Sequence, residues 1–270
     1  MPRCSGKKRI SERQRYYLSK FDIQSELNDY APLLEILTNA QEDFPDIKLF
    51  QKQYMECLFH LEKYDQILEL FKEEMNWHRP NWGLVETASK AHLLKGELDD
   101  AWRYACLAFN SHGSQKVKID LHLLISDIAE KRENIELSND FKTLTILIRS
   151  ANKLEITSDL MEHLKTITDP TITSDIILEK YHDEIQDGIY IGKPRFEGKI
   201  IWFPLDKNFA KIEYSKGPKS IIIFKDNIDM DCRYEGAKIS FIEDRNFDPK
   251  SGEEKEIARA GRRINKLVTA

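Results

Sequence analysis

Apolar residues recur every three or four positions up to residue 190, and Leu34, Leu37 and Ala40 form one such set. This spacing predicts amphipathic helices, because residues three and four apart lie on one helix face. From Phe196 onward the pattern changes to short runs rich in β-branched residues, which are typical of strands. The chain is therefore predicted to be a multidomain α-then-β protein that divides between residues 187 and 194.

Within the helical part the pattern repeats with a period of 34 residues. The cleanest copy spans 82–115, where a helix over 82–94 stops at Lys95-Gly96 and a second helix over 98–110 follows. Glycine at 96 suits the left-handed conformation that ends a helix. Apolar positions at intervals of 34 mark the successive copies: Leu33, Ile67, Ala101 and Ile135.

This copy resembles a tetratricopeptide repeat, with Ser89, Gly96, Ala101 and Ala108 at matching positions. The copy at 48–81 is looser and has Glu62 where the family has glycine; the copies near 21–47 and 116–150 are weaker. The resemblance implies an α-helical solenoid over residues 21–190, whose concave face docks a protein partner. A generic helical bundle is the alternative.

Two further helices are expected before the β region. Ser158 is a candidate cap for a helix over 159–166, and Ser174 for a helix that runs to Ile185. The second of these helices would close the open apolar end of the solenoid, as a terminal repeat must.

The β region contains five short runs separated by turn signals. Such a pattern within residues 195–265 predicts a small five-stranded barrel of the OB type. The expected strands are Lys199–Phe203, Phe209–Tyr214, Ser220–Phe224, Ala237–Glu243 and Lys255–Gly261.

Three aromatic residues, Trp202, Phe209 and Phe224, fall on the first three of these strands, where their rings can share one face. Aromatic rings on a sheet stack nucleic-acid bases, and nearby lysines attract phosphates. Four lysines surround the rings in the sequence: Lys207, Lys211, Lys219 and Lys225. The alternative is a barrel kept for protein contact, with the rings partly buried.

The same segment resembles a cold-shock domain over residues 195–265. The family's motif Lys-Gly-Phe-Gly-Phe-Ile aligns with residues 207–212, in which Phe209 survives and Lys211 replaces the second ring. The motif Phe-Val-His-Phe aligns with residues 222–225, in which Phe224 replaces the histidine and Lys225 the last ring. The resemblance implies binding of single-stranded RNA or DNA with low sequence specificity. Lysines in place of rings shift the affinity from stacking toward charge.

Charge is segregated along the chain. Residues 1–20, a predicted basic arm, hold seven Lys/Arg and one acid; residues 21–190 hold 17 against 32; residues 191–270 hold 17 against 13. An acidic solenoid favours a basic partner segment or the chain's own arm. Candidate phosphate contacts follow the fifth strand (Arg259, Arg262, Arg263 and Lys266) and lie in the arm (Arg3, Lys7, Lys8, Arg9, Arg13 and Arg15).

Composition excludes several classes of protein. No run of about 18 apolar residues predicts a membrane span, and the N-terminus does not read as a secretory signal. Four cysteines without a Cys-x-x-Cys pair indicate a reduced, cytoplasmic protein.

The sequence offers little catalytic chemistry. Seven histidines form no His-x-x-x-His pair, so a metal site is not expected. Neither a phosphate-binding loop nor a nucleophile elbow is present. We therefore expect no enzyme activity, no cofactor, no metal and no small-molecule substrate.

The resulting hypothesis is a non-enzymatic adaptor whose barrel binds single-stranded nucleic acid and whose helices dock a protein. Two alternatives stay open at this point. One is a pure protein–protein scaffold with a non-binding barrel, and the other is an accessory subunit of a nuclease or polymerase complex.

Overall fold

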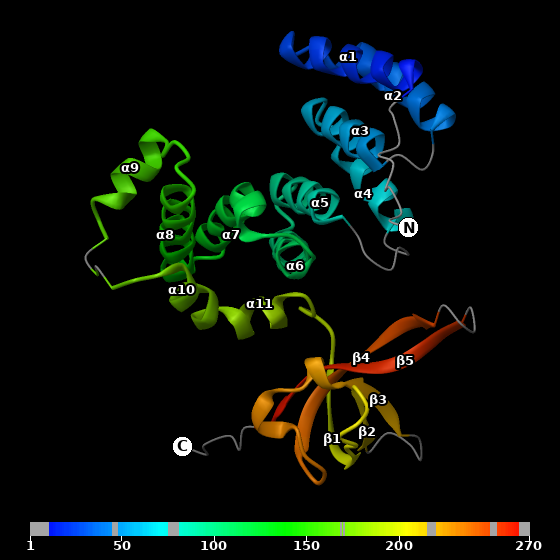
Figure 1. Cartoon of the computed structure of the whole chain (residues 1–270), viewed down its shortest axis with the longest axis vertical. Coiled ribbons are helices and arrows are strands. Elements are labelled where there is room, and N and C mark those ends of the chain that lie inside the picture. The colour runs from blue at the N-terminus through cyan, green and yellow to red at the C-terminus, as the bar shows by residue number, and fades with distance from the viewer. Residues whose placement is uncertain are drawn as a thin grey trace, which may run out of the picture. The chain divides into compact units, whose positions relative to one another are not determined.

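The computed structural model describes residues 11–44, 48–74, 81–167, 169, 171–214, 220–248 and 253–264. It divides into two compact units, Met1–Tyr181 and His182–Ala270 (Figure 1). Helices make up the first unit, and the described part of the second contains one α-helix, two short 3-10 helices and a closed five-stranded barrel. The predicted order, helical region and then β region, is confirmed, but the division falls earlier than residues 187–194.

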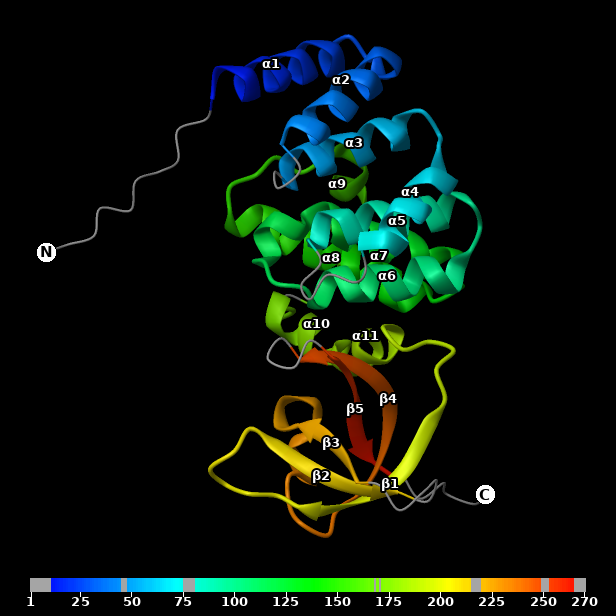
Figure 2. The same cartoon turned by 90° about the vertical axis from the view of Figure 1, so that its right-hand side faces the viewer.

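From α1 to α9 each helix of the first unit packs against the next, and α10 packs against α8 (Figure 2). The helices are α1 (Glu12–Glu26), α2 (Tyr30–Asp43), α3 (Lys48–His60), α4 (Tyr64–Glu74), α5 (Trp82–Leu94), α6 (Leu98–Asn110), α7 (Ile119–Lys131), α8 (Ile135–Ala151), α9 (Ser158–Leu164) and α10 (Ser174–Lys180). A short 3-10 helix, η1 (Gln115–Lys118), precedes α7. The predicted helices over 82–94 and 98–110 are confirmed at both ends.

The turn inside each helix pair has one residue in the left-handed region. These residues are Asn28 (φ 54°), Glu62 (φ 54°), Gly96 (φ 77°) and Glu133 (φ 64°). The first three follow the 34-residue period, and the fourth lies 37 residues after Gly96. The repeat pattern expects glycine at this turn position because the backbone there has a positive φ. Glu62 adopts the same conformation at a steric cost, since its side chain disfavours positive φ.

A reciprocal pair of substitutions tests this requirement. Glu62→Gly is expected to stabilise the helical unit by about 0.5–1 kcal/mol, and Gly96→Ala to destabilise it by about 1 kcal/mol, because only glycine adopts positive φ without strain. Apart from the two chain neighbours of Gly96, no described residue lies within 4 Å of the Cβ position there, so the effect is conformational and not steric. Urea unfolding followed by helical circular dichroism measures both; a stabilising Gly96→Ala would contradict the account.

The period of 34 fails at the fourth copy. Leu33, Ile67 and Ala101 are fully buried, as the repeat predicts, but Ile135 is 55% exposed. Ser138 occupies the equivalent buried position, because the segment that contains η1 adds three residues. The prediction that placed Ile135 in this series is therefore wrong.

In each of two adjacent helix pairs, an equivalent buried hydrogen bond links the two helices of the pair. The Ser89 hydroxyl donates to the Ala101 carbonyl oxygen at 2.7 Å, and the Ser126 hydroxyl donates to the Ser138 carbonyl oxygen at 3.0 Å. Each bond links the first helix of a pair to the second across twelve residues. A hydroxyl satisfied in this way allows two helix backbones to approach closely without leaving a buried donor unpaired.

The prediction of a basic arm over residues 1–20 is wrong for its second half, which is helical. Residues from Glu12 onward form α1, which Ser11 caps in a reciprocal bond with Gln14. Tyr17 is buried, and its hydroxyl donates to the Asp43 carboxylate at 2.6 Å. Arg13 pairs with the same carboxylate at 2.5 Å. Residues 12–20 are therefore part of the helical unit; Arg3, Lys7, Lys8 and Arg9 lie outside the described residues.

The end of the helical unit also differs from expectation. Two shorter helices, α10 and α11 (His182–Gly188), replace the single helix predicted to begin at Ser174. Thr173, rather than Ser174, caps α10. Lys180 of α10 pairs with Glu136 and Asp140 of α8, each at 2.6 Å. Thus α10 covers α8, whereas α11 belongs to the second unit.

The barrel has the strand order β1-β2-β3-β5-β4 and closes between β4 and β1 (Figure 1). Neighbouring strands are antiparallel except β3 and β5, which are parallel. The strands are β1 (Arg195–Trp202), β2 (Phe209–Tyr214), β3 (Ile221–Phe224), β4 (Lys238–Asp248) and β5 (Glu253–Arg263). Two short 3-10 helices, η2 (Lys225–Asn227) and η3 (Met230–Cys232), lie between β3 and β4.

The barrel core consists mainly of isoleucine and alanine side chains around Phe241, which is fully buried. Gly198 of β1 is needed there, because a Cβ atom would lie 2.5 Å from Ile212 and 2.8 Å from the Glu213 carbonyl oxygen. Phe196, Phe203 and Tyr214 pack against the core from its edge. Trp202, Phe209 and Phe224 do not belong to this cluster, which leaves their rings for the outer surface.

Candidate nucleic-acid interface

A β-bulge in β1 determines the direction of Trp202. Ile200 pairs with Ile212 and Trp202 with Lys211, so Ile201 is an extra residue between them. Strict alternation from the inward-facing Ile200 would turn Trp202 into the core. The extra residue restores Trp202 to the outer face beside Lys211, which is the kind of reorientation that bulges provide.

The other two rings reach the same face by ordinary alternation. In β2, Ala210 and Ile212 are buried, so Phe209 points outward; in β3, Ile221 and Ile223 are buried, so Phe224 points outward. Phe209 and Phe224 are directly opposite each other across the two strands, which places their side chains on one face.

Two of the three rings form a continuous but tilted surface. The ring centroids of Trp202 and Phe209 are 5.4 Å apart, with 52° between the planes. Trp202, Phe209 and Phe224 are each half-buried, so part of each side chain is exposed to solvent. We call these three residues the aromatic patch. The sequence prediction that they share one face is consistent with this geometry.

Two of the predicted lysines stand over the aromatic patch. The Lys207 ammonium lies 5.1 Å from the Trp202 ring centroid and 5.9 Å from that of Phe209. The Lys211 ammonium lies 5.4 Å from the Trp202 centroid. Both lysines are exposed. They therefore place positive charge where a phosphate backbone would run beside stacked bases.

Lys225 is placed differently. Its ammonium donates to the Pro204 carbonyl oxygen and lies 4.5 Å from the Phe203 ring centroid. These contacts hold the β1–β2 connection to the start of η2. In the structure Lys225 thus supports the loop that follows Trp202, and Lys219 lies outside the described residues.

The predicted arginines do not follow the fifth strand, because β5 extends to Arg263. Arg259 donates to the Asp244 carboxylate at 2.9 Å. Arg262 donates to the Asp187 carboxylate and to the Asp183 carbonyl oxygen of α11. Arg263 lies 3.6 Å from Asp231. These guanidinium groups neutralise carboxylates within the unit, and Lys266 lies outside the described residues.

Sequence reasoning missed the apolar residues around the rings. Ile201 and Ile222 are each 38% exposed, and Leu205, in the loop between β1 and β2, is 94% exposed. The alternation in β3 would have identified Ile222. Ile201 is exposed through the bulge, for which the sequence gives no clear signal. The apolar surface around the aromatic patch is therefore larger than predicted.

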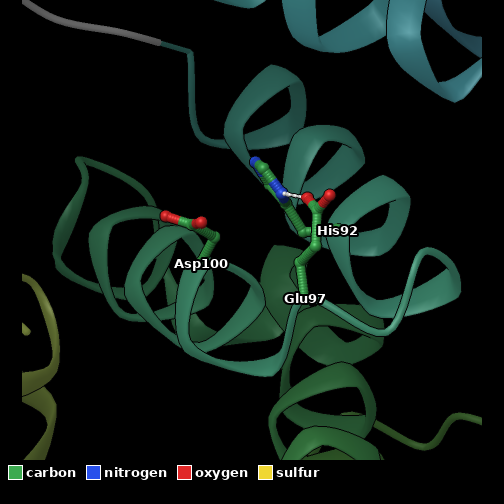
Figure 3. A group of neighbouring side chains, drawn as sticks. All are labelled: His92, Glu97 and Asp100. Atoms are coloured by element: carbon green, nitrogen blue, oxygen red, sulfur yellow. Dashed lines mark hydrogen bonds and ion pairs between the residues drawn. The ribbon is translucent and has the colours of Figure 1, made fainter.

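One cluster in the helical unit has the composition of a metal site. His92, Glu97 and Asp100 have possible ligand atoms within 4.8 Å of one another (Figure 3). His92 Nδ1 lies 2.6 Å from Glu97 Oε2, and that bond, followed by the one from Lys95, lowers the pKa of the Glu97 carboxyl. Arg103 lies 3.6 Å from the Asp100 carboxylate. Because nearby cations already satisfy both carboxylates, the cluster supports the α5–α6 turn and is a poor cation site.

Comparisons with known proteins found no match, so a functional proposal depends on the geometry of the aromatic patch. No protein-family model matches the chain, and neither a curated protein nor a solved structure shows significant similarity to it. None of the helices in the described ranges combines the length and apolar character that a bilayer span requires.

Proposed function

We propose that this protein is a non-enzymatic adaptor that binds single-stranded RNA or DNA through its barrel and a protein partner through its helices. The observation that carries the proposal is the outward placement of Trp202, Phe209 and Phe224 on three adjacent strands. In this proposal the barrel is of the OB type and similar to a cold-shock domain.

Strand topology supports the OB assignment. Five strands in the order 1-2-3-5-4, closed through β1 and β4 and with β3 parallel to β5, are expected of that fold. OB barrels bind oligonucleotides on the face formed by strands 2 and 3 and by the adjoining loops. Phe209 and Phe224 lie on those two strands, and the exposed Leu205 lies in the loop before them.

Binding would combine moderate stacking with a charge component. Each base stacked on a ring contributes about 1–3 kcal/mol. Lys207 and Lys211 now stand against the ring faces, and on binding they would move to the phosphates as bases take their places. The expected affinity is therefore modest and falls as salt increases, because phosphate contacts release counterions.

The repeated helix pairs support a tetratricopeptide-like solenoid for the first unit. Equivalent left-handed turns at Asn28, Glu62 and Gly96, and the serine bonds from Ser89 and Ser126, recur from one pair to the next. Solenoids of this kind bind extended segments of other proteins. With 32 acids against 17 Lys/Arg in residues 21–190, a basic segment is the partner best matched in charge.

Cysteine placement agrees with a cytoplasmic protein. Cys57 and Cys232 are free and buried in the described part of the chain, and Cys106 is buried as well. Burial raises the pKa of the Cys57 thiol to about 12 and that of the Cys232 thiol to about 11, so both stay protonated and unreactive.

A titration of a labelled single-stranded oligonucleotide, followed by fluorescence anisotropy at two salt concentrations, tests the proposal. We expect binding at low salt that weakens steeply at high salt, and no comparable binding of a duplex of the same length. Absence of binding near micromolar concentrations at low salt would favour the scaffold alternative. Binding only after a partner protein is added would favour the accessory-subunit alternative.

A further inference from the structure

Helix α1 has an exposed apolar stripe next to the side that packs against α2 and α3. Its buried side is formed by Tyr17, with Leu18 and Phe21 partly buried beside it. Outside this buried side Tyr16, which lines a pocket with Ile36 and Asn39 of α2, is 54% exposed. Ile23 is 53% exposed and Leu27, the C-cap residue, 68%. The stripe is uncovered by any part of the chain that the structure describes.

The spacing of the stripe is the same in both directions. Residues 16, 20, 23 and 27 are separated by four, three and four positions, which keeps them on one helix face. Lys20 fills the remaining position, and its ammonium lies 5.9 Å from the Tyr16 ring centroid, so its stem runs along the stripe. A second α1 that approaches in the opposite direction would set Tyr16 against Leu27 and Lys20 beside Ile23, twice by symmetry.

Charges on α1 have the same reciprocal arrangement. In the first half of the helix Arg13 and Arg15 outnumber Glu12, and in the second half Asp22 and Glu26 outnumber Lys20. Arg13 is paired with Asp43, whereas no ion pair within the described residues holds Arg15 or Glu26. An antiparallel pair of helices brings the basic half of each beside the acidic half of the other. A parallel pair would oppose like charges.

We propose that α1 is a contact between two copies of this chain, which pack antiparallel along the stripe of Tyr16, Lys20, Ile23 and Leu27. A symmetric dimer requires a self-complementary surface, and both the apolar spacing and the charge order of α1 satisfy that requirement. Because the surface is one helix long, the dimer forms reversibly with concentration. Two copies would present two barrels to one nucleic-acid strand.

Sedimentation velocity on the full chain, over about a hundredfold range of concentration, tests the proposal through mass action. The mass is expected to rise from one chain to two. The double variant Ile23→Glu, Leu27→Glu should stay monomeric, and helical circular dichroism confirms that it folds, since both side chains are exposed. A chain that is monomeric at every concentration, or a double variant that dimerises as before, would overturn the proposal.

Charge reversal provides a second, independent readout. Arg15→Glu alone and Glu26→Arg alone should each weaken dimerisation about three- to tenfold, because each places like charges together at two symmetric positions. The combined variant restores opposite charges and should dimerise like the unaltered chain. Failure of the combined variant to recover would contradict the antiparallel arrangement.

Discussion

Replacing both Trp202 and Phe209 by alanine is expected to weaken binding of single-stranded oligonucleotides about 100-fold at low salt. Two adjacent stacking positions are lost, and each contributes about 1–3 kcal/mol. Their ring centroids are only 5.4 Å apart, so in the proposed function they would contact neighbouring bases on one strand. Anisotropy titrations of the variant and the unaltered chain, at the same salt concentration, measure the loss.

Two variants separate this effect from damage to the fold. Tyr234→Ala removes an exposed ring that lies between η3 and β4 and is not part of the aromatic patch, and it should leave the affinity unchanged. Trp202→Phe retains an aromatic surface and should lose less affinity than the double variant. Equal losses in Tyr234→Ala and in the double variant would show that the aromatic patch is not the binding surface.

His122 by itself is expected to lower the free energy of unfolding of the helical unit by about 1.4 kcal/mol for each pH unit below 6.5. The His122 side chain is fully buried, and burial, with Lys118 nearby, lowers its pKa to about 3. Its Nε2 lies 2.8 Å from Gln115 Oε1, while Nδ1 has no hydrogen-bond partner among the described residues. Between pH 6.5 and about 3 the unfolded chain binds a proton that the folded chain does not. Stability therefore decreases as the pH falls through this range.

Urea unfolding of the unaltered chain and of His122→Leu at pH 7 and pH 5 measures this contribution. The unaltered chain should lose about 2 kcal/mol more than the variant between the two pH values. His112, which is exposed, offers a control, and His112→Asn should retain the full pH dependence. An equal loss in His122→Leu and in the unaltered chain would mean that His122 does not control the acid sensitivity.

Much of the fold follows from local sequence signals. The helices over 82–94 and 98–110 and the strand over 209–214 were predicted at their observed bounds, because glycine turns and strict periodicity mark their ends. The outward direction of Phe209 and Phe224 also follows from the alternation of buried and exposed residues in β2 and β3. These features depend on neighbours within a few residues.

Features that depend on distant contacts were not predictable. Composition suggested a basic arm over residues 12–20, although the Ser11–Gln14 capping signal was present; contacts with α2 and α3 explain why α1 forms there. The bulge before Trp202 depends on pairing with β2, and the carboxylate partners of Arg259 and Arg262 lie 15 and 75 residues away along the chain. Pairing across such separations is a property of the folded chain and not of any sequence window.

The most direct test of the account maps where a single strand contacts the protein. Backbone amide chemical shifts of the isotopically labelled chain would be compared with and without a short oligonucleotide. The account predicts the largest changes at Trp202, Phe209, Lys211 and Phe224, with smaller changes elsewhere in the barrel. Changes confined to the helical unit, or absent from β1, β2 and β3, would contradict the assignment of the aromatic patch as the nucleic-acid interface.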